Sequence, residues 1–308
     1  MSAERESPVS VVIPCYNQAR YLPDAIESVL SQRAGRPEVI VVDDGSTEPV
    51  APVVGRYPGV RLLAQSNAGV ASARNAGLRL SSRPFVVFLD ADDRLTPDAL
   101  AIGLAVLEAH PEAAGAIGLC RVIDPDGQPR PFRQQPPVYG DVYTALLRSN
   151  FVWMPAEVIY RREPLARCGG FDPSTPAAAD YDLYLRLARE FPLAVHRDVV
   201  AEYRMHDEKM SGNGLLMLQS TLRVVERQWP YARRSREHRA AYAEGNRFWR
   251  DFYGDRVVEE IRASLKTGGR RRRAFAWALA LLRHHPRAVV LHIFRKLRNT
   301  IRPVAQGG

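Results

Sequence analysis

The sequence has few cysteines and no long hydrophobic segment. Its three cysteines are far apart and lack the close pairing of a zinc site, so we expect neither a disulfide framework nor a structural metal. No stretch reaches the roughly 20 apolar residues of a transmembrane helix, and the opening residues MSAERESP lack the apolar core of a secretory signal. These absences predict a folded protein of a reducing cytoplasm that does not cross a bilayer.

A glycine-rich dinucleotide motif is also missing. The motif G-x-G-x-x-G would have to follow the first predicted strand, where the chain instead reads Pro14-Cys15-Tyr16-Asn17. This difference argues against a dehydrogenase, even though an acidic residue follows the second strand, where such an enzyme would need one.

Acidic residues become scarce toward the C-terminus. Residues 1–214 carry 22 Lys and Arg against 27 Asp and Glu, whereas residues 215–308 carry 21 against 7, a net charge of +14. From residue 261 onward there are twelve basic residues and no acidic one. Two interpretations remain open: peripheral contact with an anionic membrane surface, or a helical appendage that packs on the rest of the chain or on a second subunit. Nucleic-acid binding fits the charge alone, without a recognition motif, so we expect no nucleic-acid partner.

Continuous apolar strands alternate with helices in the first part of the chain. The pattern predicts strands within residues 9–17, 38–46, 60–69 and 84–93, and helices at 21–32 and 70–80. Thr96-Pro97-Asp98 is expected to cap a further helix. Strands that are apolar throughout form a mostly parallel sheet with helices on both faces. The sequence therefore predicts an α/β domain over residues 1–214 and a basic, mainly helical extension over 215–308.

Polar side chains follow three of the predicted strands: Tyr16 and Asn17, Asp43 and Asp44, and Asp90, Asp92 and Asp93. In a parallel sheet these positions share one edge, where ligands bind beyond the carboxyl ends of the strands. We expect the seven residues to surround one crevice.

The stretch FLDADD places three carboxylates within four positions, directly after an apolar strand. Adjacent like charges repel, and a hard divalent cation with oxygen ligands would neutralise them. Mg²⁺ or Mn²⁺, shared with a substrate diphosphate, fits the D-x-D-D spacing. The alternative is an acidic loop or a helix cap, which such a triplet often forms.

The second acidic turn, Asp43-Asp44-Gly45, follows another apolar strand. A carboxylate there can accept hydrogen bonds from ribose hydroxyls or from the imide N–H of a base. An ordinary Asp-Gly turn is the alternative. Tyr16 is placed to stack on the base.

Several stretches, taken in order, resemble the inverting glycosyltransferases called family 2, which have the GT-A fold and use nucleotide-diphosphate sugars. The stretches are VVIPCYNQARYLPDAIESVLSQ, VIVVDDGSTE, NAGVASARNAGL, FLDADD, GGFD, DYDLYLRLA and YRMHDEKMS, within residues 9–211. Each is weak alone, but the ordered set is specific. The resemblance ends before the last ~95 residues.

The resemblance implies roles for individual residues of the predicted donor site. It places Pro14, Tyr16 and Asp44 around the nucleotide base, with Asn17 and Asp43 beside them and Arg74 near the nucleotide or its phosphates. Asp90, Asp92 and Asp93 would serve ribose and metal, with Asp92 the first choice as ligand and Asp93 the second. His206 would complete the metal or diphosphate site, and a surface-loop histidine is the alternative interpretation. The implied cofactor is Mn²⁺ or Mg²⁺, and UDP is the family's commonest donor nucleotide.

Asp180 matches the position of the family's catalytic carboxylate. The usual pattern there is Glu-Asp before an aromatic residue and Asp, whereas this chain has Ala179 in place of the glutamate. The implied reaction is a single displacement in which Asp180 takes a proton from an acceptor hydroxyl and the anomeric configuration inverts. For Asp180, the alternative is a structural acid at a helix N-terminus. For the whole chain, the alternative is a non-catalytic nucleotide-sugar-binding or membrane-associated assembly protein.

The resemblance also implies a division of the first 214 residues. Residues 8–118 would bind the nucleotide, and residues 119–214 would hold the acceptor and the catalytic base. The acceptor would be a glycan or a lipid-linked glycan in cell-surface polysaccharide synthesis. The reaction would take place in the cytoplasm or at the inner face of the cell membrane. Trp153 could stack on a sugar face or belong to the core.

Overall fold

The computed structural model describes residues 5–131, 138, 140–206 and 213–266. The chain forms two compact units, one comprising Met1–Leu146 and Asn150–Lys209, the other Leu147–Ser149 and Met210–Gly308. The functional division at residue 214 stays a prediction.

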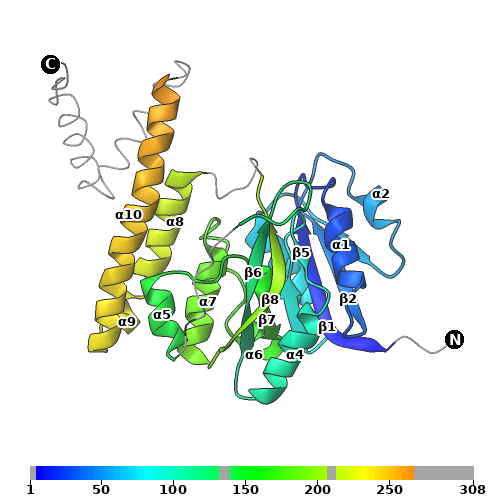
Figure 1. Ribbon diagram of the computed structural model, residues 1–308, viewed down its shortest axis with the longest axis horizontal. Coiled ribbons are helices and arrows are strands. Elements are labelled where there is room, and N and C mark those ends of the chain that lie inside the picture. Colours follow the sequence, from blue (N-terminus) through cyan, green and yellow to red (C-terminus); the bar gives the residue numbers. More distant parts are fainter. Residues whose placement is uncertain (1–4, 132–137, 139, 207–212, 267–308) are drawn as a thin grey trace, which may run out of the picture. The chain divides into compact units, whose positions relative to one another are not determined.

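An eight-stranded sheet organises the described part of the first unit, in the order β3-β2-β1-β4-β7-β6-β8-β5 (Figure 1). Its strands are β1 (Glu6–Cys15), β2 (Arg36–Asp43), β3 (Arg61–Ala64), β4 (Phe85–Phe88), β5 (Arg94–Leu95), β6 (Gly115–Ile123), β7 (Val158–Arg161) and β8 (Ala194–Arg204). β1 pairs in parallel with β2 and β4, β2 with β3, and β6 with β8, whereas β7 and β5 pair antiparallel to their neighbours.

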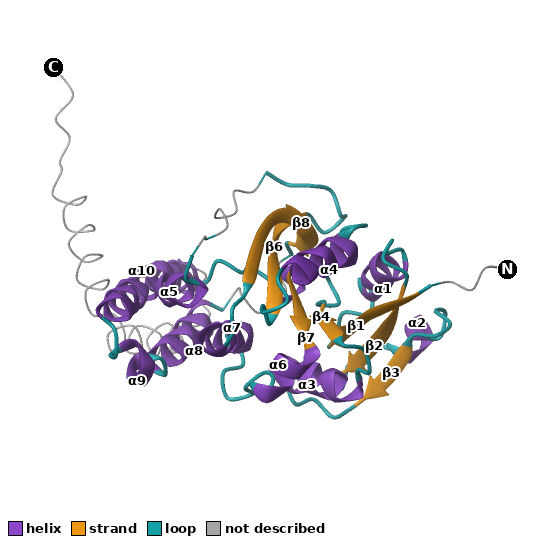
Figure 2. Ribbon diagram, turned by 90° about the horizontal axis from the view of Figure 1, so that it is seen from below, coloured by secondary structure: helices purple, strands orange, loops and turns teal. Residues whose placement is uncertain are grey.

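Helices cover both faces of this sheet, with α1 and α4 on one side and α3 and α6 on the other (Figure 2). The helices of this part are α1 (Leu22–Leu30), α2 (Ala51–Val54), α3 (Val70–Leu80), α4 (Ala99–Ala109), α5 (Val142–Arg148), α6 (Arg162–Arg167) and α7 (Ala179–Glu190), with a 3₁₀ turn η1 (Pro155–Glu157). The predicted α/β fold with helices on both faces of the sheet is confirmed, and the mostly parallel sheet that was expected is mixed, because β5 and β7 pair antiparallel to their neighbours.

The central strand β1 alternates its side chains between the two helical layers. Val11 and Ile13 belong to the core cluster that includes Ile26 of α1. Val12 faces α3 on the other side, where a Cβ on Gly77 would lie 2.2 Å from the Val12 Cγ1. Each fully buried aliphatic side chain of this kind stabilises the fold by about 1.5–3 kcal/mol. Glycine at position 77 lets α3 approach the sheet closely.

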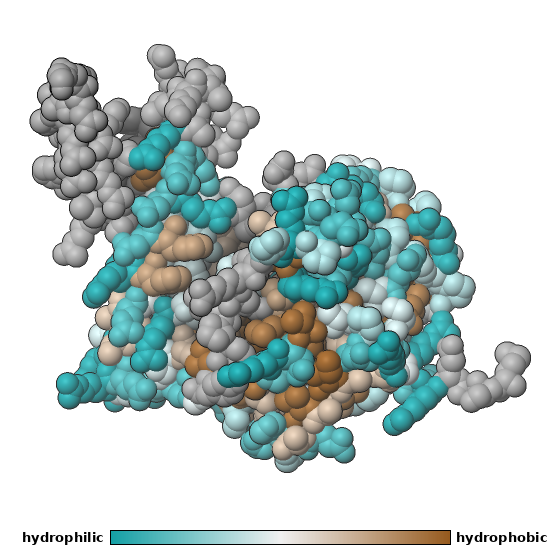
Figure 3. Space-filling view, in the orientation of Figure 1, coloured by the Kyte–Doolittle hydropathy of each residue, from teal (hydrophilic) through white to brown (hydrophobic). Residues whose placement is uncertain are grey.

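Helix α4 is apolar along most of its length and is not capped as predicted. Partly buried Ile102 and Leu104 pack against the core, and apolar side chains gather over α4 on the face shown in Figure 3. Asp98 occupies the N-cap position, but its backbone (φ −108°, ψ 8°) is not the extended form of a capping residue, and its side chain makes no cap hydrogen bond. Its carboxylate instead pairs with Arg33, at 2.8 Å. The helix predicted after Thr96-Pro97-Asp98 is therefore confirmed, but the side chain of Asp98 does not cap it.

The described part of the second unit is helical, as predicted. It contains α8 (Gly214–Glu226), α9 (Trp229–Ala232) and α10 (Arg236–Lys266). Asn213 caps α8 by accepting a hydrogen bond from the backbone N–H of Leu216. Within α10, the rings of Trp249 and Tyr253 stack on each other. No helix of the described residues has the length and apolarity to cross a membrane. The basic residues predicted to contact a membrane beyond position 266 lie outside the described residues.

Candidate active site

The parallel strands β1, β2 and β4 bring the predicted donor-site residues to one edge of the sheet. Cys15 at the end of β1 pairs in register with Asp43 at the end of β2, and Val12 pairs with Phe88 of β4. The polar residues that follow these strands therefore share the carboxyl edge. Pro14 is part of β1, opposite Val42.

In the turn after β1, Tyr16 is exposed and Asn17 makes hydrogen bonds to the turn after β2. Asn17 has a positive φ of 54°, and its backbone N–H donates to the Ser46 Oγ at 3.0 Å. Its side-chain oxygen accepts from the backbone N–H of Thr47 at 2.8 Å and from the Thr47 hydroxyl at 3.0 Å. Asn17 thus ties together the turns after β1 and β2. Tyr16, 49% exposed, is the side chain of this turn that a ligand can reach.

Asp43 and Asp44 hold loops in place. The Asp43 Oδ1 accepts from the backbone N–H of Ser46 at 2.9 Å. Asp44 is buried and accepts three hydrogen bonds, from the Gln65 side chain at 2.7 Å and from the backbone N–H groups of Ala68 and Gly69 at 2.9 Å each. The Asp44 carboxylate therefore fixes the loop that leads into α3.

Arg74 joins α3 to the acidic turn after β4. Its Nη2 lies 2.6 Å from the Asp90 Oδ1, and its guanidinium carbon lies 5.2 Å from the centre of the Phe171 ring. Its Nε is buried without a hydrogen-bond partner among the described residues. Burial alone would lower the pKa of Arg74, but the carboxylates of Asp90 and Asp180 outweigh it, so the pKa is raised. Arg74 is a fixed positive charge between these two acids.

The three aspartates after β4 have different surroundings. Asp90 is partly exposed beside Arg74. Asp92 is buried, and its Oδ2 lies 2.7 Å from the His206 Nε2. Asp93 is fully buried, and its Oδ1 accepts from the backbone N–H of Arg204 at 2.8 Å. Of the two predicted metal ligands, Asp92 is therefore the one in contact with the predicted histidine.

Arg204, which the sequence reasoning missed, holds this acidic turn in place. Its buried guanidinium donates to the backbone carbonyl of Asp92 at 2.8 Å, to that of Pro125 at 2.7 Å and to the Asp24 carboxylate at 2.7 Å. Arg204 is two residues before His206 in the stretch YRMH, so its position in that motif was the available signal.

Asp92 and His206 fit the chemistry of a divalent cation site. A carboxylate oxygen and an imidazole nitrogen already in contact offer two protein ligands, and such sites commonly leave the remaining positions to substrate phosphates. The His206 ring lies against Tyr21, with the ring centres 5.2 Å apart. No group of three or more His, Cys, Asp or Glu is arranged to hold a metal ion in the part of the chain that the structure describes.

Asp180 is the second residue of α7 and is partly buried. Burial raises its pKa, and Arg74 offsets part of that effect. Two fully buried tyrosines, Tyr160 and Tyr184, also interact electrostatically with Asp180, and burial raises the pKa of both, so they stay neutral. The carboxylate thus has the surroundings of a proton acceptor whose pKa is above the usual aspartate value.

The turn GGFD is fastened to α3 and α7 by residues that were not predicted as site residues. Asn75 donates to the carbonyl of Phe171 at 2.7 Å and accepts from its N–H at 2.9 Å. Buried Asp182 accepts from the Arg186 Nε at 2.7 Å, and the same guanidinium donates to the carbonyl of Gly170 at 2.6 Å. Asp182 therefore pairs locally with Arg186, and the pair keeps this turn beside Arg74.

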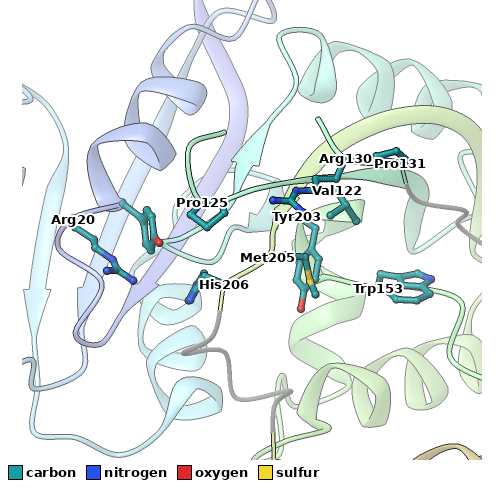
Figure 4. Close-up of a pocket in the computed structure, with 10 residues that line it drawn as sticks. Arg20, Val122, Pro125, Arg130, Pro131, Trp153, Tyr203, Met205 and His206 are labelled. Carbon is teal, nitrogen blue, oxygen red and sulfur yellow. The ribbon is translucent and has the colours of Figure 1, made fainter. Parts of the chain in front are cut away.

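A pocket of about 720 Å³ opens beside His206 in the first unit (Figure 4). Arg20 and His206 lie at one end, and Arg130, Pro131 and Trp153 lie at the other. Trp153 is 41% exposed, which favours the sugar-stacking interpretation over a core position.

The model of the protein family described as glycosyl transferase family 2 matches residues 10–169, which are more than half of the chain. The chain therefore belongs to glycosyl transferase family 2. A chondroitin synthase of Escherichia coli is 30% identical over 209 residues, which are 66% of this chain and 30% of that protein. A hyaluronan synthase of Pasteurella multocida is 30% identical over 186 residues, 58% of this chain and 18% of that protein. The chain spans less than a third of the length of these relatives.

Two solved structures share the fold. The mannosyltransferase PcManGT of Pyrobaculum calidifontis, solved with GDP-Man and Mn²⁺, has a TM-score of 0.60 and 21% identity, and the match covers 92% of this chain and 82% of that one. TarS 1-349 of S. aureus, solved with UDP-GlcNAc, has a TM-score of 0.60 and 15% identity, with 94% and 91% covered. At these identities the likeness shows the fold alone, and that fold is the GT-A-like fold expected from the sequence.

Proposed function

We propose that this chain is a metal-dependent inverting glycosyltransferase that moves a sugar from a nucleoside-diphosphate donor to a hydroxyl group. The observation that carries the proposal is the position of Arg74. Its guanidinium contacts Asp90 at the carboxyl edge of the sheet and interacts electrostatically with Asp180, which supports a single site for the proposed base and the donor residues. A buried cation in this position also suits the phosphates of a donor.

Asp180 is the proposed general base. It would accept the proton of the acceptor hydroxyl as the oxygen attacks the anomeric carbon, and its raised pKa suits that task. A single displacement needs one base and no protein nucleophile, and it inverts the anomeric configuration. Ala179 leaves the position before the base without the family's usual carboxylate.

Asp92 and His206 are the residues that would hold Mn²⁺ or Mg²⁺. When bound there, the ion would stabilise the negative charge of the departing nucleoside diphosphate. Arg204 would keep the Asp92 backbone in position for this role.

The donor is proposed to be a UDP-sugar. The two proteins with this fold were solved with UDP-GlcNAc and with GDP-Man, which supports a nucleotide sugar as the donor here. Exposed Tyr16 would stack on the base, and the loop held by Asp44 would border it.

The acceptor is proposed to be a glycan or lipid-linked glycan in the synthesis of a cell-surface polysaccharide. Two of the similar proteins are named chondroitin synthase and hyaluronan synthase, which supports a polysaccharide product. We place the reaction in the cytoplasm or at the inner membrane face, where the basic C-terminal residues would contact anionic lipid.

Sugar transfer by wild type and Asp180→Asn in the presence of Mn²⁺ tests the proposal. The variant should lose transfer by about 10²–10⁴-fold, the usual contribution of a general base, while it still binds the donor nucleotide. Asp198→Asn, which neutralises an exposed carboxylate on β8, is the matched control and should retain transfer. Undiminished transfer by Asp180→Asn would refute the assignment of the base. Nucleotide binding by wild type without any transfer or donor hydrolysis would favour a non-catalytic binding protein.

A further inference from the structure

The helices of the second unit turn back at α9, between the end of α8 and the start of α10 (Figure 1). Exposed aromatic and basic side chains gather there, on residues 226–239, which we call the α9 turn. We infer that the α9 turn binds the surface of an anionic lipid membrane, with its aromatic rings at headgroup level and its arginines on acidic headgroups. This contact is separate from residues 267–308, and it does not depend on the reaction proposed above.

The α9 turn has a hydrogen-bonded and partly buried backbone. α8 and α10 run antiparallel, since the backbone N–H of Gly214 at the start of α8 donates to the Glu260 Oε1 near the end of α10 at 2.8 Å. α9 connects their other ends (Figure 1). There Ala232 is fully buried, and the backbone N–H of Arg233 donates to the carbonyl of Trp229 at 3.0 Å. The exposed side chains of the turn are therefore carried by an ordered scaffold.

Two aromatic side chains of the α9 turn are accessible. Trp229 is 44% exposed and Tyr231 is 37% exposed. The Trp229 ring lies against Tyr242 of α10, with the ring centres 5.1 Å apart, so the indole is supported although much of it is exposed. Trp and Tyr are enriched where a bilayer meets water, because each combines an apolar body with a hydrogen-bonding group. Both side chains therefore suit the headgroup region of a membrane.

Arginines give the α9 turn a positive charge. Residues 226–239 contain five Arg and two Glu, a net charge of +3 with histidine neutral. Four of the arginines are exposed and form no ion pair with any other described residue: Arg233, Arg234, Arg236 and Arg239. Basic side chains in such a position are attracted to the negative surface potential of anionic lipids.

Residues outside the described ranges add no acid to the second unit. Those of the second unit are 210–212 and 267–308, and they contain no Asp or Glu. In the first unit, Glu4 precedes β1, and Asp207 and Glu208 precede α8. The 13 residues of α8 put about 20 Å of helix between its start and the α9 turn. The positive charge of the turn therefore does not depend on undescribed side chains of its own unit.

The basic and aromatic side chains of the α9 turn are neighbours. The Arg234 guanidinium carbon lies 5.8 Å from the centre of the Tyr231 ring. The Arg239 Nη1 donates to the carbonyl of Arg233 at 2.9 Å, so the start of α10 lies against the end of α9. Trp229 and Arg233 are four residues apart in helical backbone and so share one side of the turn. This combination matches a lipid leaflet, in which charged headgroups lie directly above an apolar layer.

The shape of the α9 turn favours a membrane over a soluble polyanion. A turn that connects two antiparallel helices is convex, and a lipid surface can contact a convex tip from one side. A single-stranded nucleic acid usually lies along a groove, and a small ligand usually binds in a concave pocket. We therefore commit to lipid as the partner, and a polyanion is an outcome of the test below.

Flotation of the full chain with lipid vesicles tests the inference. The probes are vesicles of phosphatidylcholine alone and vesicles in which about a third of this lipid is replaced by phosphatidylglycerol, the anionic component. The protein should bind the anionic vesicles about tenfold more tightly or better, and salt should weaken that binding. Equal binding to the two kinds of vesicle, or binding to neither, would overturn the inference.

Substitutions then locate the contact. Arg233→Gln combined with Arg234→Gln should weaken binding to the anionic vesicles about thirtyfold, and Trp229→Ala should weaken it about tenfold. Arg56→Gln combined with Arg79→Gln removes the same charge from two exposed positions of the first unit and should bind as wild type does. Wild-type affinity in the variant of the α9 turn would assign membrane binding to residues 267–308 and contradict the inference.

Fluorescence quenching by lipids with brominated chains reports on the position of Trp229 itself. On anionic vesicles, wild type should lose more tryptophan emission than Trp229→Phe, because the other tryptophans contribute equally to both proteins. Equal quenching would mean that Trp229 does not reach the lipid, and the inference would fail.

Heparin, a soluble polyanion, distinguishes the remaining partner. Heparin binding that is lost in Arg233→Gln combined with Arg234→Gln, while vesicle binding is unchanged, would assign the arginines to a polyanion and overturn the inference. The same variant should keep any thermal shift that UDP and Mn²⁺ cause in wild type. Failure of the donor proposal and failure of the membrane contact are therefore seen in different measurements.

Discussion

Among individual residues, Asp180 leads to the most specific prediction about activity, which concerns its dependence on pH. The acid limb of the pH profile of kcat/KM should lie above the usual pKa of an aspartate, because burial raises the pKa of Asp180 and Arg74 only partly offsets it. Since the base must be deprotonated, activity falls as the pH drops through this pKa. Measured profiles should show a slope of one on the acid side. A limb at the ordinary aspartate value would mean that another group limits the reaction.

Arg204 leads to a prediction about the stability of the folded protein. Its buried guanidinium satisfies two backbone carbonyls and Asp24, so Arg204→Met should lower the free energy of unfolding by about 2–4 kcal/mol in urea titrations. Arg33→Met removes an exposed ion pair with Asp98 and should cost less than about 1 kcal/mol. Comparable losses in the two variants would show that Arg204 does not organise the acidic turn.

The individual residues also show what a sequence can reveal about a site. Strand periodicity placed Asp44, Asp90 and Asp92 at one edge, because parallel strands share their carboxyl ends. It could not show that Asp44 would already hold three donors from a loop, and only the family resemblance, not the strand pattern, linked Asp92 to His206, which is more than a hundred residues away. Those contacts depend on tertiary packing that no local pattern encodes.

At the scale of elements, the approach of α3 to β1 depends on Gly77. Gly77→Ala should gain about 1 kcal/mol in helix propensity but lose more through the overlap with Val12, for a net destabilisation of about 1–2 kcal/mol. Gly55→Ala at the end of α2 has a negative φ and meets no atom closer than 3.4 Å, so it should be neutral or slightly stabilising. Chemical denaturation of both variants measures the difference. An equally stable Gly77→Ala variant would mean that α3 can move away from the sheet without cost.

Element prediction succeeded where the apolar pattern was uninterrupted. β1, β2 and β4 and helices α1 and α3 lie within or near the predicted ranges, because continuous apolar runs and helical spacing identify them. The predicted strand at 60–69 is short, since β3 covers only Arg61–Ala64. β8 was not predicted, because its sequence AVHRDVVAEYR mixes charges with apolar residues in no regular alternation. Its charges are accommodated by partners such as Arg94 on buried Glu202, which only the folded sheet supplies.

For the whole molecule, the change in charge along the chain lies close to the boundary between the two compact units. The sequence indicated a weakly acidic first part and a strongly basic second part, and the described residues form two compact units near that transition. The family match lies entirely within the first unit and ends at residue 169. Asp180 and His206, which complete the proposed site, lie beyond the match, so their assignment depends on the geometry and on the resemblance together.

The central claim is that the edge formed by β1, β2 and β4 binds a nucleoside diphosphate with a divalent metal. Thermal unfolding of wild type with UDP, GDP, CDP or TDP, each with and without Mn²⁺, tests it most directly. One nucleotide at about 100 times its Kd should raise Tm by roughly 5–10 °C only when Mn²⁺ is present. The same shift should be lost in Asp92→Asn and kept in Asp198→Asn. If no nucleotide changes Tm, or if the shift is independent of both Mn²⁺ and Asp92, the account of this site is wrong.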